Sequence, residues 1–225
     1  VNISQSNAAT GTLNQTAGLI SVSGNLSMTP TADCSSFLNL SGGTLSVGGT
    51  LALALRGNLP ATMVLSNTGV LIAAEMAVPD FSNTPGNYKA SYGQFIQNGG
   101  SATVGALVMA RTSYDTNPHV GTFDLNGGVF RTASITGGVA TAGGVNTGTF
   151  TFNGGTLKPL ASSAVFMQNL AAATVKDGGA VIDTDGFDIT VAQPLLHAPG
   201  AMASPLIKSG AGTLTLTGTN SLKGP

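Results

Sequence analysis

Charged side chains are scarce in this chain: they make up 8% of its 225 residues, against roughly 25% in ordinary globular domains. The formal net charge is −1, and the eight lysines and arginines are scattered singly along the sequence. Because a nucleic-acid-binding surface needs clustered positive charge, we expect neither DNA nor RNA as a partner. The hydrophobic content of 42% also excludes a highly charged, disordered chain.

Disulfides, membrane spans and signal sequences are missing as well. Cys34 is the only cysteine, which excludes an internal disulfide framework, and we expect it to be a small buried side chain. The longest apolar stretches, such as 51–55, are far too short to span a bilayer. The chain starts with Val1 and has no signal-peptide pattern, so we expect a mature form or an internal piece of a longer protein.

Glycine, by contrast, is abundant, with 32 residues, about twice its usual share. Eight glycines, each between two short apolar segments, recur at intervals of 24 to 33 residues: Gly18, Gly43, Gly69, Gly100, Gly128, Gly155, Gly179 and Gly212. Two positions after them lie Ile20, Leu45, Leu71, Ala102, Phe130, Leu157, Val181 and Leu214, and five positions before them lie Leu13, Leu38, Val64, Phe95, Phe123, Phe150, Thr174 and Ile207. A period of this length, with tolerated insertions, is typical of solenoid proteins.

The segments between these glycines have the pattern of strands. Residues 122–125, 149–152 and 213–216 alternate polar and apolar side chains, and no window shows a capped helical period. Many turns are variants of Asn-Gly-Gly, which read alone would suggest antiparallel hairpins, but their repetition favours stacked strands with asparagines hydrogen-bonded along a column. We therefore predict an all-β, single-domain parallel β-helix (β-solenoid) of about eight rungs over 1–225, a rod on the order of 40 Å long.

Two insertions interrupt the predicted rungs, at 79–93 and at 112–119. Loops inserted into a solenoid project from its wall, which is where binding sites are often built. Tyr88, Tyr92 and Tyr114 fall in these loops and are candidates to stack on sugars or on a partner protein; alternatively they cover an apolar patch of the rod.

The C-terminal stretch 206–220 contains the pattern Lys-x-Gly-x-Gly-Thr-Leu-x-Leu-x-Gly-x-Asn from Lys208 to Asn220. It closely resembles the autotransporter-associated β-strand repeat, also called the passenger-associated transport repeat. The match is specific over 177–220 and looser over 120–176, and after Asn220 the chain departs from the usual aromatic residue and glycine-rich turn. The resemblance implies a secreted or surface-displayed bacterial parallel β-helix, often a modular stalk or passenger rather than a catalyst.

The nine acidic residues give little indication of catalysis. Glycoside hydrolysis needs two facing carboxylates, and we find no pair at equivalent positions of adjacent rungs, nor an acidic cluster beside an arginine or lysine base. Asp183, Asp185 and Asp188 form the one dense acidic group and are a weak calcium candidate, with a solvated Asx-rich turn as the alternative. We expect no other cofactor, and we expect His119 and His197 to be exposed loop residues.

Three functions remain in view from the sequence. The first is a structural, extracellular or cell-surface solenoid that forms a rod or filament, because neither end of the chain has a recognisable cap and uncapped ends favour head-to-tail self-association or further repeats. The second is an adhesin-type passenger module that binds glycans or surfaces through its loops. The third, which we regard as the weakest, is a polysaccharide lyase or hydrolase.

Overall fold

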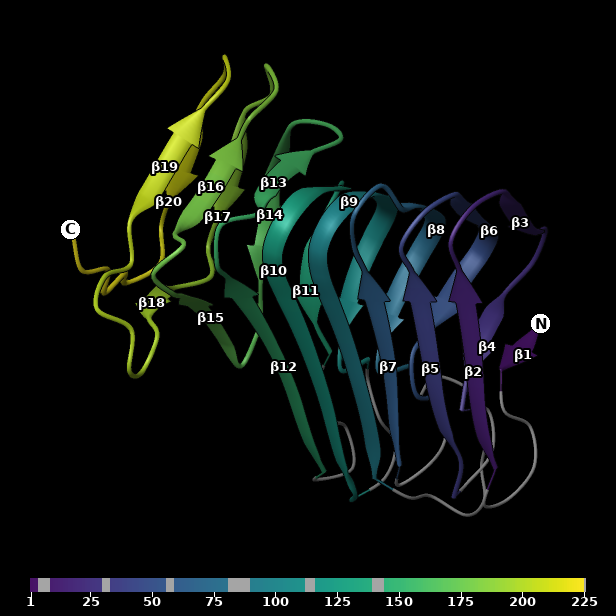
Figure 1. The fold of residues 1–225 in the computed structure, drawn as a ribbon. Coiled ribbons are helices and arrows are strands. Elements are labelled where there is room, and N and C mark those ends of the chain that lie inside the picture. The colour runs from purple at the N-terminus through teal and green to yellow at the C-terminus, as the bar shows by residue number, and fades with distance from the viewer. Residues whose placement is uncertain are drawn as a thin grey trace.

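Parallel pairing between strands one repeat apart organises the whole chain. The computed structural model describes residues 1–3, 9–29, 33–55, 59–80, 90–111, 116–138 and 144–224. All twenty strands in these residues belong to one sheet, in which neighbouring turns pair in parallel. Every regular element of the described residues is a strand, so they contain no helix that could cross a membrane. Figure 1 shows the strands side by side along the molecule, with the termini at opposite ends.

Each turn contributes one strand segment to each of three stacks. The first stack contains β2 (Thr10–Gln15), β5 (Ser35–Leu40), β7 (Pro60–Leu65), the first parts of β9 (Ser91–Met109) and β10 (Pro118–Thr132), β12 (Val145–Phe152), β15 (Ala172–Val175) and β18 (Leu195–His197). The second contains β3 (Leu19–Val22), the first parts of β6 (Thr44–Ala52) and β8 (Val70–Val78), the middle of β9, the end of β10, β13 (Thr156–Pro159), β16 (Ala180–Asp183) and β19 (Leu206–Ser209).

The third stack completes the turn. It contains β1 (Asn2–Ile3), β4 (Leu26–Met28), the ends of β6, β8 and β9, β11 (Ile135–Gly137), β14 (Ser163–Gln168), β17 (Ile189–Val191) and β20 (Leu214–Leu216). The eight strands of the first stack give about seven full turns. The predicted all-β parallel solenoid is therefore confirmed, with about seven turns where about eight rungs were expected.

Alternating side chains build one continuous core inside the coil. The inward column of the first stack runs Leu13, Leu38, Met63, Phe95, Phe123, Phe150, Ala173 and Leu195. All of these except Leu13 are fully buried. Phe123 lies between two neighbours of this column, with ring centroids 4.7 Å from those of Phe95 and Phe150 and nearly parallel to the latter. Strand spacing and aromatic stacking thus have the same period, so the stacked rings fit the repeat of the turns.

The register corrects several of the predicted columns. Met63, Ala173 and Leu195 occupy the inward positions assigned to Val64, Thr174 and Ile207, and Ile182 occupies the position assigned to Val181. Three of these errors are slips of one residue, and a slip of one moves a side chain to the opposite face. Ile207 is a larger error, because it lies on β19 in the second stack and is 51% exposed.

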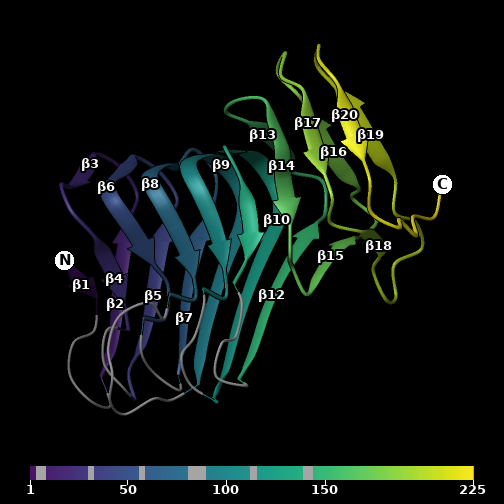
Figure 2. The same cartoon turned by 180° about the vertical axis from the view of Figure 1, so that it is seen from behind.

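Gly212 is also misplaced in the predicted series. It precedes β20, which pairs with β17, so it lies at the corner between the second and third stacks, beside Gly186 and Phe187. The position equivalent to Gly179 in the last turn is Pro205, because Ala180 pairs with Leu206. The corners at 184–188 and 210–213 are longer than those of the first turns, and β16, β17, β19 and β20 stand above their neighbours in Figure 2.

Candidate functional site

The predicted turn glycines mark the corner between the first and second stacks, apart from Gly212. Gly43 and Gly128 have φ of +71° and +72°, and a Cβ there would approach a backbone oxygen of the previous turn to 2.4 Å. Gly69 and Gly155 do not have positive φ; the left-handed residues of those turns are Asn67 and the neighbouring Gly154. Apart from Gly18, where a Cβ would meet nothing within 4 Å, these glycines serve close stacking of turns, which is a structural role.

Polar side chains continue the backbone ladder through this corner. The amide of Asn126 donates to Asn98 Oδ1 at 2.9 Å, and the amide of Asn153 donates to Asn126 Oδ1 at 3.1 Å. At the C-terminal end of this ladder, Asp177 accepts the backbone N–H groups of Met202 and Ala203 at 2.7 and 2.9 Å. These two hydrogen bonds, chiefly that from Ala203, lower the pKa of Asp177. The asparagine ladder expected from the sequence is thus present over three turns.

Most of the long connections of the chain join the third stack to the first; the exception is 198–205, which joins the first stack to the second in the last turn. The connections from the third stack to the first run over 4–9, 29–34, 53–59, 79–90, 110–117 and 138–144, and shorten to 169–171 and 192–194 in the later turns. The insertions predicted at 79–93 and 112–119 belong to this one corner but end earlier, because β9 begins at Ser91 and β10 at Pro118. Their shared position brings several chemically active side chains to a single edge of the solenoid.

An ion-pair cluster at this edge was not expected from the sequence. The Arg111 guanidinium contacts the Glu75 carboxylate, and its Nε lies 3.2 Å from Asp80 Oδ1. The Thr50 hydroxyl donates to Glu75 Oε1 at 3.1 Å, and the Arg111 N–H donates to Pro79 O at 3.1 Å. The expectation that no acidic cluster adjoins an arginine is therefore wrong. The sequence did not indicate that Asp80 and Arg111 pair, because both lie at the ends of insertions, where the repeat does not define a register.

This cluster joins two successive turns through ion pairs, which is a structural role. Two carboxylates surround one guanidinium, and Asp80 is nearly buried, with a side chain 9% exposed. The guanidinium is engaged by both acids, so it is not poised as a base. The side chains of Arg111 and Glu75 are 24% and 30% exposed, so the cluster is only partly accessible to solvent.

The three aspartates of the calcium candidate do not form one site. Asp183 and Asp185 both approach Lys158, with its Nζ 2.7 Å from Asp183 Oδ2 and 3.4 Å from Asp185 Oδ1. The hydrogen bond from Lys158 lowers the pKa of Asp183 and in turn raises the pKa of Lys158. Asp188 has different neighbours, at the start of the third stack. Across the described residues, no three His, Cys, Asp or Glu side chains are grouped to hold a metal ion.

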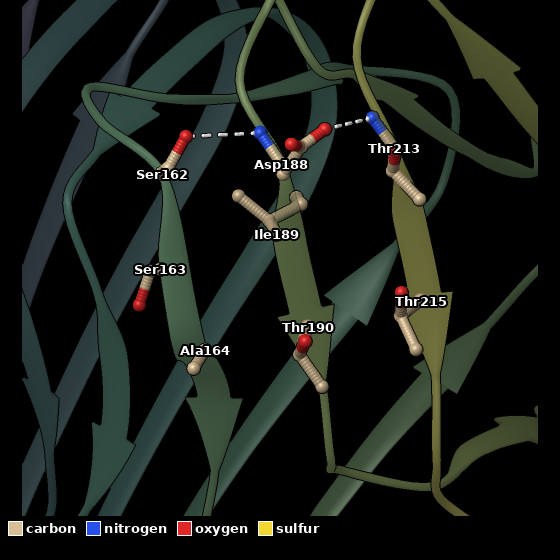
Figure 3. A pocket seen from close by; sticks show the side chains of 8 residues that line it. All are labelled: Ser162, Ser163, Ala164, Asp188, Ile189, Thr190, Thr213 and Thr215. Carbon is tan, nitrogen blue, oxygen red and sulfur yellow. Dashed lines mark hydrogen bonds between the residues drawn. The ribbon is translucent and has the colours of Figure 1, made fainter.

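Asp188 lies in a shallow hollow of about 410 Å³ on the outside of the third stack (Figure 3). Its backbone N–H donates to Ser162 Oγ at 3.1 Å, and its Oδ1 accepts the Thr213 N–H at 2.7 Å. The other lining residues are Ser163, Ala164, Ile189, Thr190 and Thr215. A hydroxyl nucleophile would need a neighbouring base, and the one carboxylate in this lining is already committed to the next turn. The hollow therefore lies over hydrogen bonds that join successive turns of the solenoid.

The aromatic and histidine candidates lie in strands where the structure describes them. Tyr92 belongs to β9 and points outward, 38% exposed, so its assignment to an inserted loop was wrong. Tyr88 and Tyr114 lie outside the described residues. His119 is fully buried in β10, and His197 lies in β18 with Nδ1 3.2 Å from Ser204 Oγ, so neither is the exposed loop residue that was expected.

Comparison of the chain with protein-family models, with curated proteins and with solved structures finds no match. The resemblance of 206–220 to the autotransporter-associated repeat stays a prediction. In the solenoid this segment forms β19, the second-to-third corner and β20.

Proposed function

We propose that this chain is a non-enzymatic, extracellular structural solenoid whose end turns stack on further turns of the same kind to make a longer rod or filament. The further turns come from another copy of the chain or from additional repeats of a longer one. The single observation that carries the proposal is the state of the two end turns.

The first and last turns leave core side chains half covered. Within the part of the chain that the structure describes, the partly buried hydrophobic residues that pack against the core all lie in the first turn or in the last: Ile3, Leu13, Ile20, Leu206, Leu214, Leu216 and Leu222. Among the described strands, β2 and β3 pair only with the following turn, and β19 and β20 only with the preceding one. Unpaired strand edges over exposed apolar groups favour addition of another strand layer.

The outward face of the second stack also favours the addition of further turns at both ends. One outward column of the second stack begins at Leu19 and ends at Ile207, and these two residues are 67% and 51% exposed. If a second copy continued the parallel register, its Leu19 would lie beside Ile207 of the first. Contacts of this head-to-tail kind do not close, so they generate filaments.

Electron microscopy of the purified chain tests this proposal. We expect rods at low concentration that lengthen into filaments as the concentration rises, and strictly single rods at high concentration would contradict assembly between copies of this chain. The control variant Ile72→Lys should form the same filaments as the unsubstituted chain. Ile72 lies on the same face and is 45% exposed, but it belongs to a middle turn that takes no part in end-to-end contacts.

A second candidate is an adhesin-type passenger module, favoured by the gathering of six of the long connections at the corner between the third and first stacks. Deleting 81–89 and 112–115 together would then abolish binding to a cell surface and leave the melting temperature nearly unchanged. Equal binding before and after deletion would reject this role for the connections.

A lyase or hydrolase is the weakest proposal. The Glu75–Arg111–Asp80 cluster is internally paired, and Asp188 is held in a structural ladder. We expect no cleavage in a screen of uronic-acid and neutral polysaccharides, with and without calcium, and turnover in that screen would overturn the non-enzymatic proposal.

A further inference from the structure

We infer that the outer face of the first stack carries a binding strip for an uncharged polysaccharide, centred on Tyr92 and running along the solenoid axis. The inference goes beyond the proposed structural role and does not depend on filament formation. It rests on a hollow, two exposed aromatic rings, a row of hydrogen-bonding side chains and the charge of the face.

The hollow lies over the central strands of the first stack. It has a volume of about 210 Å³ and is lined by Pro60, Tyr92, Gly93, Gln94, Val120 and Thr122. Parallel pairing places Pro60, Tyr92 and Val120 in one row along the axis, and Thr62, Gln94 and Thr122 in the next. Tyr92 borders the hollow and is 38% exposed, so part of its side chain is accessible to a ligand.

The strip combines two exposed aromatic side chains with polar ones. Phe37, 39% exposed, pairs with Thr62, which pairs with Gln94, so Phe37 lies two turns before Gln94 in the same row. Aromatic rings bind the apolar faces of sugars, and hydroxyl and amide groups hydrogen-bond to sugar hydroxyls. The Gln94 amide lies 3.5 Å from Asp124 Oδ2, at the limit of a hydrogen bond, so both side chains keep capacity for a ligand.

The charge of this face selects an uncharged ligand. Among the outward positions of the described first-stack strands, Asp124 is the single charged residue, and there is no lysine or arginine. The Asp124 carboxylate would repel an acidic polysaccharide, and the face has no cationic side chain to attract it, whereas a neutral polysaccharide would not be repelled. The turns repeat every ~4.8 Å, a spacing close to that of successive rings in an extended sugar chain, so one chain can contact several turns.

Affinity electrophoresis of the full chain tests the strip. The gels contain hydroxyethyl cellulose, galactomannan or polygalacturonate. We expect retardation by at least one of the neutral polymers and none by polygalacturonate. Tyr92→Ala should weaken that binding about tenfold, Phe37→Ala should weaken it less, and Tyr92→Phe should keep most of it.

The matched control is Ile72→Ala, which removes an exposed apolar side chain from the second stack and should leave retardation unchanged. Thermal melts verify that each variant is folded. Three results would overturn the inference: no retardation by either neutral polymer, stronger retardation by polygalacturonate, or equal retardation of Tyr92→Ala and the unsubstituted chain.

Discussion

At the scale of single residues, the glycines separate into those required by stacking and those required only by backbone conformation. Gly18 and Gly43 have nearly equal φ, at +73° and +71°. A Cβ at Gly18 meets nothing within 4 Å, because this turn is the first, whereas a Cβ at Gly43 would approach Gly18 O to 2.4 Å. The same substitution at these two sites therefore isolates the effect of a neighbouring turn.

We predict that Gly18→Ala lowers the free energy of unfolding by about 1 kcal/mol through left-handed strain alone. Gly43→Ala should cost at least about 2 kcal/mol more, because a backbone oxygen must also move. Urea unfolding of the two variants measures the difference, and equal losses would show that close stacking is not what these glycines serve.

Lys158 and Asp183 give the stability of the fold a testable dependence on pH. Because the hydrogen bond from Lys158 lowers the pKa of Asp183, folding is stabilised above the ordinary pKa of 3.8 and this stabilisation is lost as the pH falls through the lower, folded value. Asp183→Asn should therefore reduce stability near pH 7 by about 0.5 kcal/mol and flatten the decline of melting temperature below pH 4. In a Lys158→Met background the substitution should have a smaller effect, and an unchanged effect there would argue against this pairing.

At the scale of elements, the parallel strands could be predicted but their register could not. Period-two alternation and the recurring Asn-Gly-Gly turns indicated stacked strands, and the asparagine ladder of Asn98, Asn126 and Asn153 followed from them. Glycines also occur at the second-to-third corner, so a glycine alone does not identify its corner, and Gly212 was assigned to the wrong one. Connections of unequal length then allow slips of one residue, as at Val64.

The candidate sites were less predictable than the strands, because they depend on which turns lie side by side. The Glu75–Arg111–Asp80 cluster joins residues from the ends of two irregular connections, for which spacing carries no information. The separation of Asp188 from Asp183 likewise reflects a corner that turns the chain between them. Tyr92 was noticed for its aromatic ring, but its place on a strand face required the pairing of β7, β9 and β10.

The stacked phenylalanines give a prediction for the core. Phe123 is fully buried between Phe95 and Phe150, so Phe123→Ala should lower the free energy of unfolding by about 3–5 kcal/mol. Phe37→Ala, at a side chain 39% exposed on the outer face, is the matched control and should cost less than about 1 kcal/mol. Similar losses for the two variants would mean that the inward and outward faces of the first stack are wrongly assigned.

At the scale of the whole molecule, charged side chains are few, and nearly all of the described residues belong to one repeated turn of three strand segments. The turns share one core cluster that extends from the first turn to the last. Most hydrogen-bonding side chains described here complete ladders between successive turns, as Asn126, Asp177 and Asp188 do. The first and last of the described turns differ from the others in their half-covered core side chains, which is why we propose a function in assembly.

Sedimentation of two complementary end variants tests that central claim most directly. Leu19→Lys places a charge on the first edge, and Ile207→Lys places one on the last edge; both residues are largely exposed, so each variant should fold. Each variant alone should sediment as a monomer at concentrations where the unsubstituted chain forms filaments. An equal mixture should form dimers, because one intact first edge then meets one intact last edge. A mixture that stays monomeric, or single variants that still form filaments, would contradict head-to-tail stacking.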